Sequence, residues 1–164
     1  MTVVSNTSPL SNLAIIRRLD LLREQFGVVL IPEAVRLELA ALEHAAGSSA
    51  IAHALATQWL QVLAVKNPQL VQAHEERLGL GEAQAITLAL EQNASLLLMD
   101  EADGRETAVA AGLRVQGALG VLRTARQTGR ITSLRDELHR LRAEAHFFVG
   151  AVLEQELLKT VGEK

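Results

Sequence analysis

The stretch Val3-Val4-Ser5-Asn6-Thr7-Ser8-Pro9-Leu10 decides the fold, because it has the pattern of a strand that turns directly into a helix. Its two valines are apolar and β-branched, which favours a buried strand. Ser8 offers a side-chain oxygen as a helix N-cap, and Pro9 suits the first helical position, where a missing N–H costs nothing. Asn6 is therefore predicted to lie at the carboxyl end of a strand. In open sheets of parallel strands, ligands bind at that edge.

The composition favours one α/β domain over residues 1–164. Hydrophobic residues make up 49% of the chain and aromatic residues only 2%, so the core must be built from Leu, Ala, Val and Ile. This composition suits helices packed on a parallel sheet and argues against an all-β sandwich. The chain has no cysteine, which excludes disulfides and cysteine-based metal sites.

The sequence does not predict export or membrane insertion. No run reaches the roughly 18 apolar residues of a membrane span, and the N-terminus lacks the basic region of a signal peptide. We therefore predict a soluble, cytoplasmic protein with no membrane partner. The formal net charge of -3 does not indicate nucleic-acid binding, but a local patch matters more than the total for that function.

Apolar strands alternate with helical patterns along the chain. After the first strand, further strands are predicted at Val28–Ile31, Trp59–Val65, Ser95–Met99 and Leu113–Gln116. The first helix is predicted to break near Arg17-Arg18, and Gly47-Ser48-Ser49 is predicted to form a turn. Strands that alternate with helices of ten or more residues predict parallel βαβ units with right-handed crossovers.

The last third of the chain is helical and locally basic. Two helical patterns, at residues 134–145 and 149–161, carry apolar positions that would cover a face of the sheet or form a dimer interface. Six arginines lie between residues 123 and 142. They would suit a phosphate backbone, although arginines on amphipathic helices usually form a solvated face.

Three acidic residues stand out by their predicted positions. Glu38 shares a helical face with Leu39, and Glu82 shares one with Ile86, so both are predicted to face the interior. Asp100 ends an apolar strand that is predicted to be central. If that strand is a neighbour of the first strand, the three carboxylates and the Asn6 amide converge at one edge of the sheet.

A convergence of carboxylates favours a metal ion. Clustered carboxylates repel one another and resist ionisation unless a cation joins them. Oxygen ligands, without cysteine or paired histidine, indicate Mg²⁺ or Mn²⁺ rather than zinc. A carboxylate-bound Mg²⁺ commonly serves phosphate chemistry.

Each of these residues also has a purely structural interpretation. Asn6 fits a turn, Glu82 fits the favourable charge at a helix N-terminus, and Asp100 fits the cap of a helix. Glu101 and Asp103 are typical of solvated acids at a helix start, although both lie close enough in sequence to reach the site as accessory ligands. Inward acids are costly to bury, so their joint placement favours the functional interpretation.

The order of short motifs resembles the PIN-domain nucleases, including the VapC-like toxins of bacterial toxin–antitoxin pairs. The similarity is greatest to a bacterial branch of PIN-like proteins of unassigned function. That branch carries a start like the opening stretch, followed by four further motifs. They are Leu-Asp-Leu-Leu at Leu19–Leu22, Gly-Glu-Ala at Gly81–Ala83, Gly-Leu-Arg-Val at Gly112–Val115 and Leu-Gly-Val-Leu at Leu119–Leu122.

This resemblance implies a Rossmann-like, three-layer α/β/α sandwich with a mostly parallel sheet. It also implies Mg²⁺- or Mn²⁺-dependent hydrolysis of single-stranded RNA, a homodimer and, for a toxin, an antitoxin protein as partner. Carried over by position, the metal-binding and catalytic residues are Asn6, Glu38, Glu82 and Asp100, and those contacting the substrate are Thr7 and Ser8.

Asn6 is a departure from the family pattern, because active members usually have aspartate there. An amide oxygen can ligate a hard cation, but it contributes no charge and cannot act as a base near neutral pH. The first hypothesis is therefore a metal-dependent endoribonuclease, and the second is a catalytically weak or inactive PIN-fold module that binds nucleic acid or protein. A phosphoacceptor receiver domain is a weaker third alternative, because the first strand lacks the acidic pair that such domains use.

Overall fold

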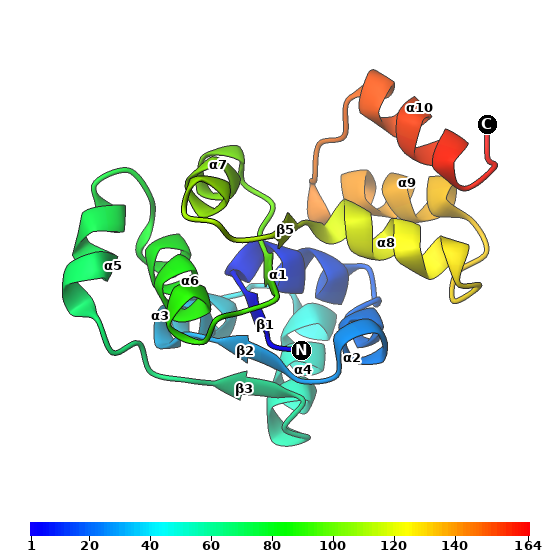
Figure 1. Cartoon of the computed structure of the whole chain (residues 1–164). Helices are drawn as coiled ribbons and strands as arrows, with labels where there is room; N and C mark the ends of the chain where they lie inside the picture. The colour runs from blue at the N-terminus through cyan, green and yellow to red at the C-terminus, as the bar shows by residue number, and fades with distance from the viewer.

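Five parallel strands form the centre of the molecule in the order β3-β2-β1-β4-β5 (Figure 1). The computed structural model describes residues 1–164. The strands are short and their bounds are β1 (Val3–Ser5), β2 (Val29–Ile31), β3 (Leu60–Val62), β4 (Leu96–Leu98) and β5 (Val115–Gln116). The predicted strands are all present, and the predicted parallel pairing is confirmed. Of the residues predicted in the third strand, only those from Leu60 to Val62 pair with β2.

Ten helices surround this sheet. Their bounds are α1 (Thr7–Ile15), α2 (Asp20–Phe26), α3 (Glu33–Ala40), α4 (Ala45–Ala56), α5 (Pro68–Glu75), α6 (Leu80–Glu91), α7 (Ala102–Ala110), α8 (Ala118–Gln127), α9 (Leu134–Ala145) and α10 (Ala151–Thr160). Val3 of β1 packs with helices α1, α2, α4 and α8, whereas Val4 packs with α6 and α7 on the other face. The sheet is therefore the middle layer of an α/β/α sandwich.

The first helix begins two residues earlier than the N-cap prediction for Ser8 requires. Thr7 is its first residue, and Asn6 lies at the N-cap position without a side-chain capping hydrogen bond. The Asn6 amide instead donates across the sheet edge to Glu101. The predicted break after this helix is confirmed, because Arg17 adopts a left-handed φ of 63° between α1 and α2.

The predicted turn at residues 47–49 is wrong, since these residues lie inside α4. The His44 side chain accepts a hydrogen bond from the Gly47 backbone N–H at 2.9 Å and so caps the helix. A Cβ at Gly47 would lie only 3.4 Å from Cγ1 of Ile15. The glycine therefore allows α4 to pack closely against α1, which a local turn pattern does not reveal.

The C-terminal helices form an outer layer over α8 and α1 (Figure 1). The leucines at 134, 138 and 141 of α9 are fully buried in this layer, and α10 packs on α9. The prediction that these helices cover a face of the sheet itself stays a prediction, because the contacts of α9 are with α8 and α1. The alternative prediction of a dimer interface stays a prediction.

Glu163 connects the end of the chain to the start of α9 through hydrogen bonds. We therefore expect Glu163→Gln to destabilise the protein by about 1–2 kcal/mol. Its carboxylate accepts hydrogen bonds from the backbone N–H of Leu134 at 2.7 Å, from that of Arg135 at 3.2 Å and from Arg126 Nε at 2.9 Å. Burial raises the pKa of Glu163, but these hydrogen bonds outweigh it and leave the pKa below the ordinary value of 4.5.

A depressed pKa gives stability that is present above the ordinary pKa and is lost as the pH falls through the folded-state pKa. The deficit of Glu163→Gln in urea denaturation is therefore expected to be full at neutral pH and to shrink below pH 4.5. Glu156→Gln is the matched control, because Glu156 is exposed on α10 and makes no ion pair. A deficit that is the same for both variants would contradict this account.

Candidate functional site

The carboxyl ends of β1 and β4 meet at one edge of the sheet. Ser5 pairs with Leu98 in the parallel register, and the Asn6 backbone N–H donates to the Leu98 carbonyl at 2.9 Å. The expectation that these two strands are neighbours is thus confirmed. The polar residues that follow the two strands are brought together at this edge.

Asn6 is held at the bottom of this edge and is only 2% exposed. Its Nδ2 donates to Oε2 of Glu101 at 3.2 Å, and the Ser8 hydroxyl donates to the other oxygen of the same carboxylate. The amide oxygen Oδ1 of Asn6 is buried and has no hydrogen-bond partner. A buried acceptor without a partner is costly, so it marks a position at which a donor or a cation is missing.

Glu38 approaches the same edge from α3. The Thr7 hydroxyl donates to Oε2 of Glu38, and a Cβ built at Gly81 would lie 2.2 Å from that oxygen. The glycine therefore leaves the space that the carboxylate occupies beside the start of α6. Glu38 is an exposed residue, whereas the helical pattern predicted an interior one. The phase of α3 is as predicted, because Ala34, Val35 and Leu39 are buried, and Glu38 lies at the margin of this face, on the rim of the site.

Glu82 lies in the first turn of α6 and is half-buried. Burial raises the pKa of Glu82, and the neighbouring Glu101 carboxylate raises it further. The backbone of Gly79 opposes this shift, while Glu38 and Asp103 add smaller contributions in the upward direction. The predicted convergence of acids is thus visible in the electrostatics, since carboxylates of α3, α6 and the start of α7 disfavour ionisation of Glu82.

Asp100 is placed differently from these acids. Its Oδ1 accepts from the Ala118 backbone N–H at 2.8 Å and its Oδ2 accepts from Asn12 Nδ2 at 3.3 Å. Burial raises the pKa of Asp100, and these hydrogen bonds offset the shift only in part. Both oxygens therefore serve to join β4 to α8 and α1. The carboxylate that contacts Asn6 is that of the next residue, Glu101.

The donor chemistry of this edge fits a hard divalent cation. All donors are oxygens, Glu101 contacts the Asn6 side chain, and Glu101 and Glu38 lie close enough to Glu82 to raise its pKa. With the side chains as they stand, no three His, Asp or Glu side chains form a group able to hold a metal ion. Glutamate side chains have several rotatable bonds, so changes of rotamer can bring their carboxylates closer to an ion.

A five-stranded parallel sheet between helical layers, with acids at the carboxyl edge of its central strands, defines a nuclease-like α/β/α fold. The model of the family DUF3368, described as a PIN domain, matches residues 2–163. The chain therefore belongs to the PIN-domain family. No curated protein shows significant sequence similarity to it. None of its helices is both long enough and apolar enough to cross a membrane.

Membership of this family supports nuclease activity, because PIN domains are commonly nucleases that use divalent metals. A fold does not by itself establish a reaction, so the function has to be argued from the site. The arrangement of Asn6, Glu38, Glu82 and Glu101 carries that argument. Two contributors were not identified from the sequence, namely Asn12, which holds Asp100, and Gly81, which makes room for Glu38.

Proposed function

We propose that the protein is a Mg²⁺- or Mn²⁺-dependent endoribonuclease that hydrolyses phosphodiester bonds of single-stranded RNA. The observation that carries the proposal is the buried, unpartnered Oδ1 of Asn6 among the acids at the carboxyl edge of β1 and β4. Mutually repelling carboxylates and a free amide oxygen form a site that a divalent cation would stabilise. The residues that would hold it are Asn6, Glu38, Glu82 and Glu101.

The sequence also predicts Asp100 as a metal ligand. In this proposal, Asp100 is a positioning residue instead. Its two hydrogen bonds to the protein fix the segment that carries Glu101. Thr7 and Ser8, predicted to contact the substrate, already orient Glu38 and Glu101 through their hydroxyls. Asp103 contributes negative charge near Glu82 from the first turn of α7.

A divalent cation in such a site supplies positive charge to the scissile phosphate and promotes the ionisation of water. The protein's own contribution is to hold the acids in fixed positions before the substrate arrives. Hydroxyl–carboxylate hydrogen bonds from Thr7 and Ser8 reduce the freedom of two of these acids. Such preorganisation lowers the cost of assembling the site around a phosphate.

The family also supports a more specific role as the toxin of a toxin–antitoxin pair. That role would add an antitoxin protein as partner and a homodimer as the assembly. Both belong to the proposal and rest on family membership alone. Coexpression with the protein encoded beside it, followed by RNA cleavage assays on the purified complex, tests the antitoxin. Light scattering of the isolated chain tests the dimer.

The ribonuclease proposal is tested by incubating end-labelled single-stranded RNA with the protein in Mn²⁺, Mg²⁺ or EDTA. Cleavage is expected with either ion, none in EDTA, and a large loss in Glu38→Gln. Glu43→Gln is the matched control, because Glu43 is an exposed acid just beyond α3. Equal cleavage by the Glu38 and Glu43 variants, or full cleavage in EDTA, would overturn the mechanism.

One observation favours a second candidate function, namely the neutral side chain of Asn6. A PIN-fold module that binds RNA or protein without cutting it needs no strong cation site. This candidate predicts RNA binding by the wild type and no cleavage even after Asn6→Asp. Cleavage by the Asn6→Asp variant alone would instead define the protein as a nuclease scaffold that lacks one charge.

The close approach of Glu38 to α6 gives a further prediction. Gly81→Ala places a methyl group where the Glu38 carboxylate lies, so that carboxylate must move away from Thr7. Mn²⁺ binding, measured by calorimetry, is expected to weaken at least about ten-fold, or 1.4 kcal/mol. The free energy of unfolding should stay equal or rise by up to about 1 kcal/mol, because alanine is favoured over glycine within a helix.

Gly120→Ala is the control for this substitution. Gly120 lies in α8, and its added methyl group meets the side chain of Gln116 in β5 and none of the acids. It is expected to leave the Mn²⁺ affinity unchanged. Equal affinities of the Gly81→Ala variant and the wild type would show that the position of Glu38 does not matter to cation binding.

A further inference from the structure

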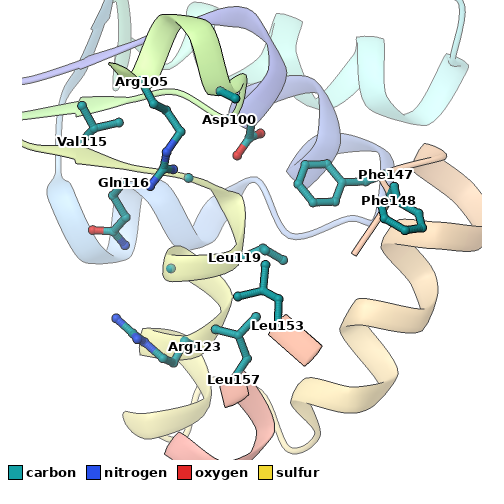
Figure 2. Close-up of a pocket in the computed structure, with 13 residues that line it drawn as sticks. Asp100, Arg105, Val115, Gln116, Leu119, Arg123, Phe147, Phe148, Leu153 and Leu157 are labelled. Carbon is teal, nitrogen blue, oxygen red and sulfur yellow. The ribbon is translucent and has the colours of Figure 1, made fainter. Parts of the chain in front are cut away.

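A cavity of about 700 Å³ lies beside the acidic edge, between α7, α8 and α10 (Figure 2). Asp100 lies at one end of it, and the next residue, Glu101, contacts Asn6. The residue that lines the cavity and the residue that contacts Asn6 are thus consecutive in the segment after β4. Figure 2 shows two phenylalanines on one side of the cavity and two arginines on the opposite side.

The two arginines bring positive charge to the cavity, and Arg105 lies near the Asp100 carboxylate, where burial raises the pKa and Arg105 lowers it in part. Neither Arg105 nor Arg123 takes part in a salt bridge. Arg105 donates to the Met99 carbonyl at 3.1 Å, which uses one guanidinium nitrogen and leaves other N–H groups free. Arg123 is exposed on α8. The Arg123 guanidinium has no carboxylate partner and is well suited to phosphate oxygens, and the free N–H groups of Arg105 can add a second contact.

The phenylalanines lie in the segment between α9 and α10. Phe147 is half-buried and packs against the core, whereas the ring of Phe148 is 88% exposed. The whole chain has three phenylalanines, no tyrosine and one tryptophan, so two adjacent aromatic rings at one cavity are a concentration. An exposed aromatic ring beside unpaired arginines is the combination that binds single-stranded nucleic acid, by base stacking and by phosphate contacts.

We propose that this cavity binds a nucleotide of single-stranded RNA next to the bond that is cut, with its base on Phe148 and adjacent phosphates on Arg105 and Arg123. RNA as the ligand rests on the proposed function. An RNA chain alternates flat apolar bases with anionic phosphates, which matches rings on one wall and guanidinium groups on the other. A strand that leaves the cavity past Asp100 reaches Glu101 and the acidic site.

The proposal implies a preference for single strands. A base has to leave its stack to lie on Phe148, and only unpaired RNA offers its bases without first breaking pairs. An acidic or apolar segment of a partner protein is the competing occupant. Such a segment would need an apolar side chain at position 148, whereas an RNA base needs a flat aromatic ring. Substitutions of Phe148 therefore distinguish the two occupants.

The test measures RNA binding without cleavage, by fluorescence anisotropy of labelled single-stranded RNA in Ca²⁺ in place of Mg²⁺. Phe148→Ala is expected to weaken binding about ten-fold, and Phe148→Trp to retain it. Phe148 is exposed, so its replacement does not threaten the fold. Val152→Ala is the matched control, because Val152 is 71% exposed on α10 and does not line the cavity. It should bind RNA as the wild type does.

The arginines are tested through the salt dependence of binding. Each phosphate contact contributes about 0.7 to the slope of log K against log salt for a single strand, so Arg123→Gln should reduce that slope by about 0.7. Arg114→Gln is the control, because Arg114 is exposed and lies outside the cavity. The slope for Arg114→Gln is expected to equal that of the wild type.

Three results would overturn the proposal. They are no RNA binding by the wild type, unchanged binding by Phe148→Ala, and full binding by Phe148→Leu, which would indicate an apolar protein segment as occupant. The cleavage assay is independent of these measurements. If the wild type never cleaves RNA but Phe148→Ala still weakens binding, the proposed function fails and the RNA-binding cavity stands. If the wild type cleaves RNA but Phe148→Ala binds RNA as the wild type does, the proposed function stands and the RNA-binding cavity fails.

Discussion

Asn6→Asp is expected to make the protein less stable without a divalent cation and to make the cation bind more tightly. The Asn6 amide donates to Glu101 at 3.2 Å, and an aspartate would replace this hydrogen bond by a buried carboxylate in contact with the Glu101 carboxylate. An unpaired buried charge costs about 2–4 kcal/mol. The melting temperature in EDTA should therefore fall by roughly 5–10 °C.

With a cation present, the same substitution has the opposite effect. A carboxylate in place of the unpartnered Oδ1 adds one negative charge to the ligand set. Mn²⁺ is expected to bind at least about ten-fold more tightly and to restore the melting temperature at saturation. Calorimetry and thermal denaturation measure both effects. Asn93→Asp is the control for the chemical change, because Asn93 is exposed and distant in sequence from the site. Equal shifts in the two variants would contradict the placement of Asn6 in the site.

Glu82→Gln is expected to reduce metal-dependent RNA cleavage by about 100-fold or more, which is about 2.7 kcal/mol in the activation barrier. The glutamine keeps the shape of the side chain but removes a charge that faces Glu101 and Glu38. Because that charge is repelled by its neighbours and partly buried, its loss should not destabilise the protein in EDTA. The melting temperature is expected to stay equal or to rise by about 2 °C.

The combination of lost activity with retained stability is the informative result for Glu82. A residue that served only as a favourable charge at a helix N-terminus would behave differently, since Glu82→Gln would then lower stability and leave cleavage intact. Glu75→Gln provides the reference for an exposed helical acid, here at the end of α5. Cleavage rates and melting curves of the three proteins in the same buffers distinguish the two interpretations.

The sheet and its acidic edge can be predicted from local sequence patterns, whereas the different contacts of Asp100 and Glu101 cannot. Apolar β-branched runs and the alternation with helices are sufficient to place the strands in parallel βαβ units. Both acids lie after β4, in the segment that leads into α7, and their side chains make separate contacts there. Which of them reaches Asn6 depends on where Asn12 and the start of α8 lie, and the sequence does not specify that.

The cavity likewise could not be predicted from local sequence patterns, because its walls come from three separate helices, α7, α8 and α10. The basic segment that starts at Arg123 gave an ambiguous signal. In the structure, Arg126, Arg140 and Arg142 pair with carboxylates of the C-terminal layer, so they mainly stabilise the fold. Arg123 differs from these in having no such partner. The stronger local signal was the pair Phe147-Phe148 in a chain nearly free of aromatic residues.

The Asn6 amide has a consequence for how this protein can evolve. Its nitrogen satisfies Glu101 and its oxygen is left free, so the fold tolerates an empty site at the cost of a weaker hold on a cation. Asparagine and aspartate codons differ by one base. A lineage carrying this fold can therefore move between a protein that is robust when empty and one that depends on its ion by a single point mutation, without rebuilding any other part of the site.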